Sequence, residues 1–563
     1  MPYGYDGFYI LLGCPGGGKT TRVAKTVHRI CAAAPPEASA DGRSPVVVVS
    51  LTNAAAREAA GRDLPIRKDA VGTLHSKGYR SLGCPPIVTQ ALVQEEWNRE
   101  HPGFALSPET FSKAPDDDED DPVFRGGGQM PGDDTYAEHE LDRHRMTPDE
   151  HRAPLVRRFA ALWTAFKGGC GAIDFTDMIE HGGPDGTHPG VVIADEAQDL
   201  SRLEFAYLVR LKEADGAALI LVGDPDQCIY HWRGADWKIL HDPAATATDS
   251  LPASHRLPRA VHAFAWSVIR RAPGHGTTPY APRDADGIVR RIGATLRLPD
   301  DAVALAEDRW SDGKSVMLLA AANYMADSLA YELRRRGLPF GNPWRTRRGA
   351  WNPLAERAGV TKKDRLLAMT HWHDHDGAPW TLAQVRAFVD PLSSRLAGLP
   401  KGAKKRLDDL CADSATARSQ SSLDDLRDLV GETVLFAIGS CTDGKAAARW
   451  WYEHLLDAQK PGAKYAVDVY LARGRDVLAS PVLKGAKIIT PGTIHSVKGG
   501  EADVVILFPD IPWAAERERH EDPEAEAALC RLFYVGATRA REELVLCEPG
   551  GGRGNGYFDW GNA

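Results

Sequence analysis

Residues Phe8-Tyr-Ile-Leu-Leu-Gly-Cys-Pro-Gly-Gly-Gly-Lys-Thr20 form an apolar run that ends in a glycine-rich turn, a lysine and a threonine. Such a run, opening into a helix, is typical of the strand–loop–helix unit of a parallel sheet. The stretch from Gly13 to Thr20 matches the full phosphate-loop pattern, in which glycines let backbone N–H groups turn toward phosphates. In that pattern Lys19 neutralises phosphate charge and the Thr20 hydroxyl ligates Mg²⁺.

Further short apolar runs predict more strands of the same kind. They lie at 46–49, 191–193 and 219–222, and in the second half of the chain at 316–319, 488–489 and 504–508. The run at 191–193 leads directly to Asp195 and Glu196. Ligands of open α/β sheets bind at the carboxyl ends of the strands, so these carboxylates are expected beside the phosphate loop. There Asp195 can hold the Mg²⁺ water shell and Glu196 can orient and deprotonate an attacking water.

The order of these runs predicts an α/β protein with two parallel-sheet cores, each interrupted by a mainly helical insertion. A chain of 563 residues with 43% hydrophobic residues is long enough for three or four domains. The expected domains are a first core at 1–84 and 185–245, an insertion at 85–184, a second core at 246–345 and 481–563, and a second insertion at 346–480.

The composition bears on three questions: a nucleic-acid partner, disulfides or a zinc site, and a membrane span. The net charge of -9 argues mildly against a nucleic-acid partner, but binding phosphates requires only a local basic groove. The nine cysteines are scattered without a CxxC pair, which favours reduced cytoplasmic thiols over disulfides or a zinc site. No apolar run is long enough to span a bilayer, and we expect no membrane association.

Seven stretches in chain order resemble the motifs of UvrD-like superfamily-1 helicases. Four are long and specific, namely those similar to motifs II, III, V and VI. Asp195-Glu-Ala-Gln-Asp199 is similar to motif II, and Gly223-Asp-Pro-Asp-Gln-Cys-Ile-Tyr-His-Trp-Arg-Gly-Ala235 to motif III. The others are Ser50–Glu58 (Ia), Gly72–Ser76 (Ib), Leu251–Arg256 (IV), Thr493–Glu501 (V) and Arg531–Ala540 (VI). Together with the phosphate loop they cover the chain from Gly13 to Ala540.

The resemblance implies two RecA-like P-loop motor domains that bind ATP and Mg²⁺ between them. It implies that Gln227 senses the γ-phosphate and that Arg256 and Arg539 act as arginine fingers from the second core. It further implies that His255 stacks on the base and that Glu501 accepts a hydrogen bond from the ribose. The remaining nucleotide-binding positions are Gly13, Pro15, Gly16, Gly17, Gly18, Lys19, Thr20 and Thr21, with Thr20 and Asp195 at the metal.

The resemblance also implies a path for single-stranded DNA and for single/double-strand junctions. Trp232 is the expected stacking platform, because base–aromatic stacking tolerates any sequence. The other expected contacts are Thr52, Asn53, Thr73, His75, Tyr230, Arg233, Thr493 and His495.

The chain departs from the family at several positions. No glutamine precedes the phosphate loop to read adenine, His255 stands where the family has tyrosine, and Leu51 stands where it often has an aromatic residue. The strictness of ATP selection is therefore left open. The missing glutamine and the compact insertions indicate a divergent, phage-type branch.

The resulting hypothesis is an ATP-dependent DNA helicase that moves 3′ to 5′ on single-stranded DNA and unwinds duplex, in DNA repair or replication. The polarity comes from the resemblance and not from the physics of the residues. Two alternatives stay open: a translocase that strips proteins from single strands without unwinding, and the motor subunit of a nuclease complex. The sequence predicts no particular protein partner.

Overall fold

The structure is a computed structural model of the 563-residue chain. It describes residues 7–33, 44–50, 64–111, 130–187, 189–275, 279–342, 380–390, 392–421, 423–440, 449–450, 453–454, 467–469, 471–473, 488–550 and 555–561. The chain divides into two compact units, and each is described by itself. The first unit comprises Met1–Arg291, Ala320–Ala322 and Thr493–Ala563, and the second comprises Ile292–Leu319 and Asn323–Gly492.

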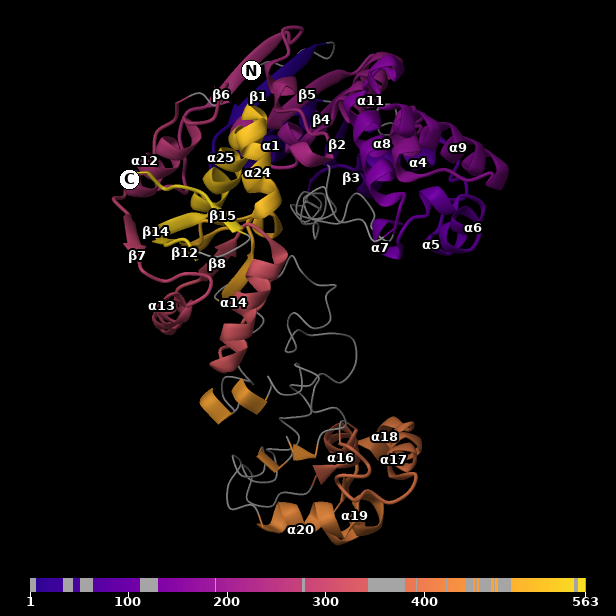
Figure 1. The fold of residues 1–563 in the computed structure, drawn as a ribbon, viewed down its shortest axis with the longest axis vertical. Helices are drawn as coiled ribbons and strands as arrows, with labels where there is room; N and C mark the ends of the chain where they lie inside the picture. The colour runs from indigo at the N-terminus through magenta and orange to yellow at the C-terminus, as the bar shows by residue number, and fades with distance from the viewer. Residues whose placement is uncertain are drawn as a thin grey trace. The chain divides into compact units, whose positions relative to one another are not determined.

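The first unit contains a six-stranded sheet in the order β3-β2-β4-β5-β1-β6, in which β1 lies between β5 and β6 (Figure 1). Neighbouring strands pair in parallel, and Leu11 lies opposite Val222 on one side and Asp249 on the other. The strands are β1 (Phe8–Gly13), β2 (Val46–Ser50), β3 (Val71–Thr73), β4 (Val191–Ala194), β5 (Ala218–Gly223) and β6 (Ala247–Leu251).

Helices cover both faces of this sheet. Ile10 on β1 belongs to a buried cluster with Tyr207 of α11 (Arg202–Asp215). Its neighbour Leu11 belongs to a second cluster with Val27 of α1 (Lys19–Ala33). Because successive side chains of a strand point to opposite faces, α1 and α11 lie on opposite sides of the sheet.

A helical segment between β3 and β4 has an aromatic core of its own. Trp97, Phe159 and Trp163 are fully buried, and the rings of the two tryptophans meet edge to face at 5.0 Å. The helices are α4 (Leu74–Ser81), α5 (Gln90–Leu92), α6 (Asn98–Glu100), α7 (Pro108–Phe111), α8 (Asp133–Arg145), α9 (Pro154–Cys170) and α10 (Phe175–Glu180), with a π-helical turn at Val93–Trp97 and 3-10 turns at Pro102–Phe104 and Asp149–His151. A further 3-10 turn, Lys68–Ala70, directly precedes β3.

A second sheet has five strands in the order β11-β8-β12-β14-β7. They are β7 (Ile288–Ile292), β8 (Val316–Ala320), β11 (Ile489–Thr493), β12 (Ala502–Leu507) and β14 (Ala540–Cys547). The first unit holds the helices α12 (Arg259–Ile269), α24 (Trp513–Glu521) and α25 (Pro523–Ala537), and the antiparallel pair β13 (Asp510–Pro512) and β15 (Asn555–Tyr557). Every residue from Ala527 to Ala537 is buried, so α25 is a central helix and not a surface one.

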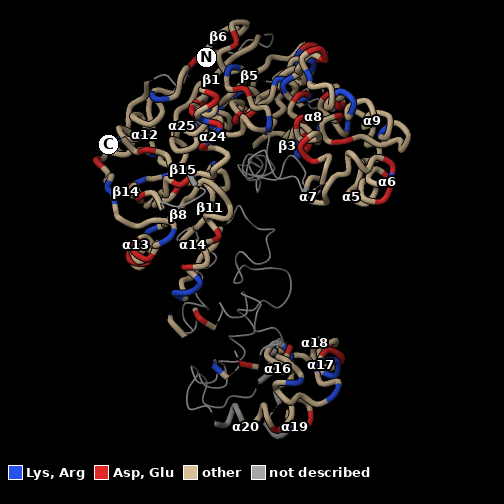
Figure 2. The backbone as a smooth tube through the Cα atoms, in the orientation of Figure 1, with Lys and Arg blue, Asp and Glu red and all other residues tan. Residues whose placement is uncertain are grey.

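In the second unit, α14 (Asn323–Arg335) follows β8 and stops before Gly337, whose φ of 61° lies in the left-handed region that favours glycine. The other described elements are α13 (Asp300–Ser311), β9 (Trp380–Thr381), β10 (Gln420–Ser421), α16 (Leu382–Val389), α17 (Ala403–Cys411), α18 (Ser414–Ala417), α19 (Leu423–Val430) and α20 (Glu432–Ser440). Basic and acidic residues are interspersed along the helices of both units (Figure 2).

The predicted α/β class with two parallel sheets is confirmed, and each apolar run named above lies in a strand or overlaps one. Four strands of these two sheets were not predicted, namely β3, β6, β7 and β14, and neither were the short strands β9, β10, β13 and β15. β6 reads Ala-Thr-Asp-Ser-Leu and lies at the edge of its sheet, half exposed, so it carries no buried apolar run. Among the described residues, no helix combines the length and the apolarity that crossing a membrane requires.

Candidate nucleotide site and strand path

The phosphate loop connects β1 to α1 in the conformation that its glycines permit. Gly16 and Gly18 have φ values of 68° and 82°, a region that side chains disfavour. The N–H of Gly17 donates to the Cys14 carbonyl at 3.0 Å, which closes the turn. Lys19, at the first position of α1, is buried and its Nζ lies 3.5 Å from the Gly13 carbonyl oxygen. The lysine is thus folded back over the loop that it follows.

Asp195 and Glu196 follow β4 as predicted, and Glu196 has a left-handed backbone with φ of 55°. This strained conformation is uncommon for a residue with a side chain and is found more often at functional sites. Gln198 Nε2 donates to Glu196 Oε2 at 2.5 Å. Burial opposes ionisation of Glu196, but the charges of Lys19 and Lys498 outweigh it and lower the pKa of this carboxyl. Glu196 is therefore an ionised carboxylate held by an amide.

Gln227 and Arg539, predicted from separate motifs, lie in direct contact. Arg539 Nη2 donates to Gln227 Oε1 at 3.0 Å, and Gln227 Nε2 donates to Asp224 Oδ2 at 2.6 Å. Arg539 is 1% exposed and also donates from Nε to the Val535 carbonyl at 2.9 Å. Burial lowers the pKa of Arg539 to about 9, and the neighbouring Arg256 adds to this effect. The guanidinium remains protonated at neutral pH, because the charges of Glu196 and Glu501 oppose the effect of burial.

The segment 254–256 lies directly against the phosphate loop. The N–H of His255 donates to the Gly16 carbonyl at 2.9 Å, and Ser254 Oγ donates to the Pro15 carbonyl at 2.6 Å. A side chain added at Gly16 would lie 2.4 Å from Arg256 Cβ, so this glycine is also needed for the close approach. The predicted base-stacking and arginine-finger positions are thus brought to the loop.

Glu501, the predicted ribose contact, is held by two arginines. Arg256 Nε donates to its Oε2 at 2.7 Å, and Arg541 Nη1 donates to its Oε1 at 2.6 Å. Burial opposes ionisation, but these two cations lower the pKa of the Glu501 carboxyl. The carboxylate therefore keeps its charge and still has lone pairs for a hydroxyl donor.

Sequence reasoning missed Lys498, which lies where several motifs meet. Its Nζ forms an ion pair with Asp199 and donates to the Gln227 carbonyl at 2.8 Å. The same ammonium lies 4.8 Å from the ring centroid of Tyr230. Burial raises the pKa of Asp199 to about 6 in spite of this lysine. Both residues stand inside the quoted motifs V and II, so their place within these motifs was the available signal.

The predicted threonine and histidine contacts of the strand path are mostly buried. Thr73 Oγ1 accepts from the Ser76 N–H at 3.2 Å, and Thr493 Oγ1 accepts from the Ser496 N–H at 3.1 Å. Both hydroxyls therefore cap the turns that follow them. The histidines, His75 and His495, are 4% and 5% exposed. The predicted contacts Thr52 and Asn53 lie outside the described residues.

The predicted stacking residues are gathered on the 3-10 turn η7 (His231–Arg233) and the residue before it. The ring centroids of Tyr230 and Trp232 lie 6.3 Å apart, and the guanidinium carbon of Arg233 lies 5.5 Å from the Tyr230 centroid. Trp232 is partly exposed, and its Nε1 has no hydrogen-bond partner among the described residues. An aromatic face and a cation thus lie side by side at this turn.

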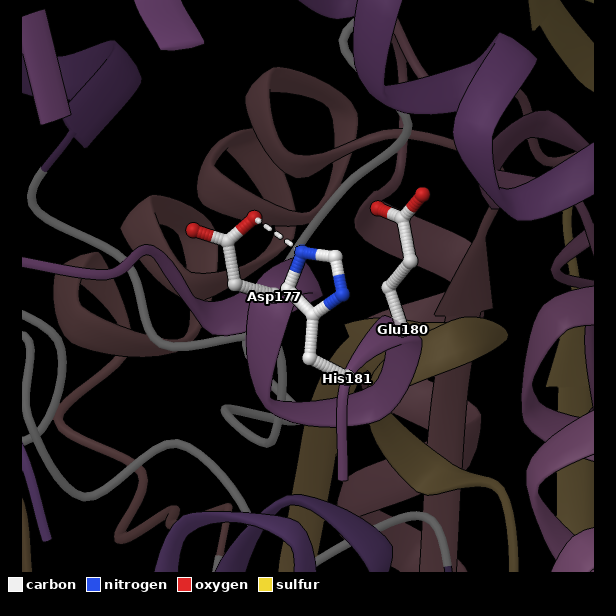
Figure 3. A group of neighbouring side chains, drawn as sticks. All are labelled: Asp177, Glu180 and His181. Atoms are coloured by element: carbon white, nitrogen blue, oxygen red, sulfur yellow. Dashed lines mark ion pairs between the residues drawn. The ribbon is translucent and has the colours of Figure 1, made fainter. Parts of the chain in front are cut away.

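Asp177, Glu180 and His181 also lie close enough to suggest a metal site (Figure 3). Their oxygens are already neutralised, because Arg143 Nη2 bonds Asp177 Oδ1 at 2.6 Å and Glu180 Oε2 at 2.7 Å. Lys167 Nζ bonds the other Asp177 oxygen at 2.5 Å. We assign the buried Asp177 and the exposed Glu180 to an ion-pair network with Arg143 and Lys167 that joins α8, α9 and α10.

Comparison with known proteins gives two family matches and two similar proteins. An AAA domain family matches residues 4–233, and a UvrD-like helicase C-terminal domain family matches residues 490–547. DNA helicase II of Escherichia coli (strain K12) is 26% identical over 160 residues, which are 27% of this chain and 22% of that protein. DNA helicase II of Salmonella typhimurium matches with the same identity and shares. The aligned region thus spans about a fifth of the length of these relatives.

Proposed function

We propose, from the premise that the chain is a member of the UvrD-like helicase family, that it is an ATP-driven motor acting on DNA. The observation that carries the proposal is the contact between Arg539 and Gln227, which are 312 positions apart in the chain. Gln227 follows β5 of the sheet that holds the phosphate loop, whereas Arg539 immediately precedes β14 of the other sheet. A nucleotide beside this contact can therefore affect both sheets.

Residues of the first sheet would bind the phosphates. Backbone N–H groups from Gly13 to Thr21 and the Lys19 ammonium would hold the phosphate oxygens. The Thr20 hydroxyl and the Asp195 carboxylate are the hard oxygen donors that Mg²⁺ prefers, so the residues present fit this ion. When bound, Mg²⁺ neutralises phosphate charge.

The hydrolytic step would use Glu196 and the two arginines. Glu196, ionised and held by Gln198, is suited to accept a proton from the attacking water. Arg256 and Arg539 would pair with oxygens of the transferring phosphoryl group. In the structure Arg256 contacts Glu501 and the Thr538 carbonyl, and it would exchange one of these partners for phosphate. His255 would stack on the base, and Glu501 would accept a bond from the ribose.

The strand would run past η7, with Trp232 stacking on a base and Arg233 close to the backbone. The other proposed contacts are Tyr230, Thr52, Asn53, Thr73, His75, Thr493 and His495. The same proposal includes the predicted domain boundaries, movement in the 3′ to 5′ direction, unwinding of duplex and a cytoplasmic location. The stripping translocase and the nuclease-complex motor remain its alternatives.

The test is ATP hydrolysis with and without single-stranded DNA. We expect single-stranded DNA to raise the rate, and we expect Glu196→Gln to lower it by about 10²–10⁴-fold, the usual contribution of a general base. Lys19→Ala should abolish turnover. An unchanged rate in both variants contradicts the proposed site. Forked duplexes with 3′ or 5′ tails then determine polarity and separate a helicase from a stripping translocase.

A further inference from the structure

Two buried tyrosines from distant parts of the chain share one hydrogen bond. The hydroxyl oxygens of Tyr280 and Tyr534 lie 2.9 Å apart, although the residues are 254 positions apart in the sequence. Tyr280 is 6% exposed and Tyr534 is fully buried. Burial raises the pKa of both phenols, so both keep their protons at neutral pH. A neutral pair of hydroxyls therefore joins two distant segments of the first unit.

Tyr280 belongs to a segment that is bonded to the backbone of Arg256. Its neighbour Ala281 forms a parallel bridge with Ala253, and the Ala281 carbonyl accepts from the Ser254 N–H at 2.8 Å. Ser254 Oγ in turn accepts from the Arg256 N–H at 3.2 Å. The place of Tyr280 thus affects where the first predicted arginine finger begins.

Tyr534 lies on α25, close to the second predicted arginine finger. The carbonyl of its neighbour Val535 accepts from Arg539 Nε at 2.9 Å. The Tyr534 carbonyl accepts from the Thr538 N–H at 2.9 Å, and the Thr538 carbonyl accepts from Arg256 Nη1 at 3.2 Å. The bonds therefore lead from one tyrosine through Arg256 back to the other. When Arg256 exchanges a partner for phosphate, the bond between the hydroxyls still joins the two segments.

Aromatic rings of α12 hold the Tyr280 ring in place. The His262 ring meets it edge to face at a centroid distance of 4.8 Å, and the Trp266 ring does so at 6.2 Å. Edge-to-face contacts of this kind stabilise a ring without involving its hydroxyl. A phenylalanine at this position would keep these contacts, so Tyr280→Phe removes the hydrogen bond and little else.

We propose that Tyr280 and Tyr534 are positioning residues that fix Arg256 and Arg539 relative to one another for phosphoryl transfer, an inference that rests on the proposed function. Arg256 follows β6 of the first sheet, whereas Arg539 immediately precedes β14 of the second. Two guanidinium groups stabilise the charge of one phosphoryl group only when both reach its oxygens. The bond between the tyrosines sets the spacing of the segments that carry them.

The experiment measures ATP hydrolysis by Tyr280→Phe, Tyr534→Phe and the double variant in the full chain, at saturating single-stranded DNA. We expect kcat to fall by about 10- to 100-fold in each single variant, because a misplacement of about 1 Å can cost about 10²-fold. KM for ATP should stay unchanged, because the arginines act in the transition state. Tyr207→Phe is the matched control: it removes a hydroxyl that donates to the Gly183 carbonyl at 3.1 Å, and it should leave kcat unchanged.

The double variant separates positioning from a purely structural role. Each single substitution leaves a buried hydroxyl without this partner and should lower the melting temperature, whereas the double substitution removes both hydroxyls and should restore it. The kcat of the double variant should stay as low as that of the single variants, because the link between the arginine segments is still absent.

Three outcomes overturn the inference. They are a double variant that recovers kcat together with its melting temperature, single variants whose kcat matches that of Tyr207→Phe, and a change confined to KM. If Arg256→Ala leaves kcat unchanged, the proposed function is wrong instead.

Discussion

Two turns of the first unit have nearly the same sequence and the same local hydrogen bonds, but different distant partners. One turn reads Thr73-Leu-His-Ser76 and the other Thr493-Ile-His-Ser496, and in each the serine Oγ donates to the threonine carbonyl, at 2.8 and 2.9 Å. Each is followed by a mostly buried lysine that pairs with an aspartate, Lys77 in the first turn and Lys498 in the second.

The partners give the two lysines different roles. Lys77 pairs with Asp185, which Arg80 of the same helix also contacts at 2.9 Å, so this pair ties a helix to a nearby loop. Lys498 bonds Asp199 and the Gln227 carbonyl, so it joins motif V to motifs II and III. The comparison teaches that local sequence fixes the turn, whereas the distant partner determines what the lysine does.

The largest expected effect comes from breaking the second ion pair. Lys498→Met should lower DNA-stimulated ATP hydrolysis by about 100-fold, which corresponds to about 2.7 kcal/mol, because motif V loses its bond to the Gln227 carbonyl. Steady-state hydrolysis with saturating DNA measures this. Lys498→Arg, which keeps the charge, is the control and should retain more activity. Equal activity of Lys498→Met and the unmutated protein would show that the pair is only structural.

Breaking the first ion pair should affect stability instead of activity. Breaking a buried ion pair typically costs about 3–5 kcal/mol. Lys77→Met should lower the free energy of unfolding by less than this, because Arg80 still compensates the charge of Asp185. Denaturant unfolding measures the change, and hydrolysis per folded molecule should be unchanged. A large loss of hydrolysis in the folded variant would place Lys77 in the motor itself and remove the contrast between the turns.

His495 of the second turn should make the stability of the protein depend on pH. Burial lowers the pKa of His495 to about 3, below the ordinary value of 6.5, and its Nε2 lies 3.3 Å from the Ile229 carbonyl oxygen. The neutral folded form contributes stability that is fully present above pH 6.5 and is lost as pH falls toward 3. At pH 5 this loss amounts to about 2 kcal/mol.

His495→Gln tests this pH dependence. The variant should lose less stability than the unmutated protein between pH 7 and pH 5, as measured by thermal unfolding at both values. Asp199 should have the opposite effect, because its pKa is raised to about 6. Its contribution to the free energy of unfolding is greatest at low pH and is lost as pH rises through about 6. Asp199→Asn is therefore the companion variant, and parallel pH curves for all three proteins would contradict both assignments.

The smallest effect is expected from the threonines, where the two turns should agree. Thr73→Val and Thr493→Val each remove a capping oxygen and should cost about 1 kcal/mol of stability. If the hydroxyls serve only as caps, DNA affinity stays unchanged in both variants. A selective loss of DNA affinity in either variant would support the strand contact proposed for that threonine.

Much of the fold was predictable because buried parallel strands carry continuous apolar runs. β1, β2, β4 and β5 were recognised in this way, and Asp195 and Glu196 directly follow the carboxyl end of β4. β14 was missed because three charged residues, from Arg541 to Glu543, follow its first position. β3 has only three residues, too few for any pattern to mark it.

The sequence by itself determined the local conformations of this protein. The glycines of the phosphate loop permit its left-handed turns. In each Thr-x-His-Ser stretch, the threonine Oγ1 accepts a hydrogen bond from the backbone N–H three residues later. Only the tertiary structure decided which side chains from distant motifs meet, such as Arg539 with Gln227 and Lys498 with Asp199. The reason is physical: turns and caps depend on neighbours within a few residues, whereas these meetings join positions that are up to 312 apart and depend on how the sheets and helices pack.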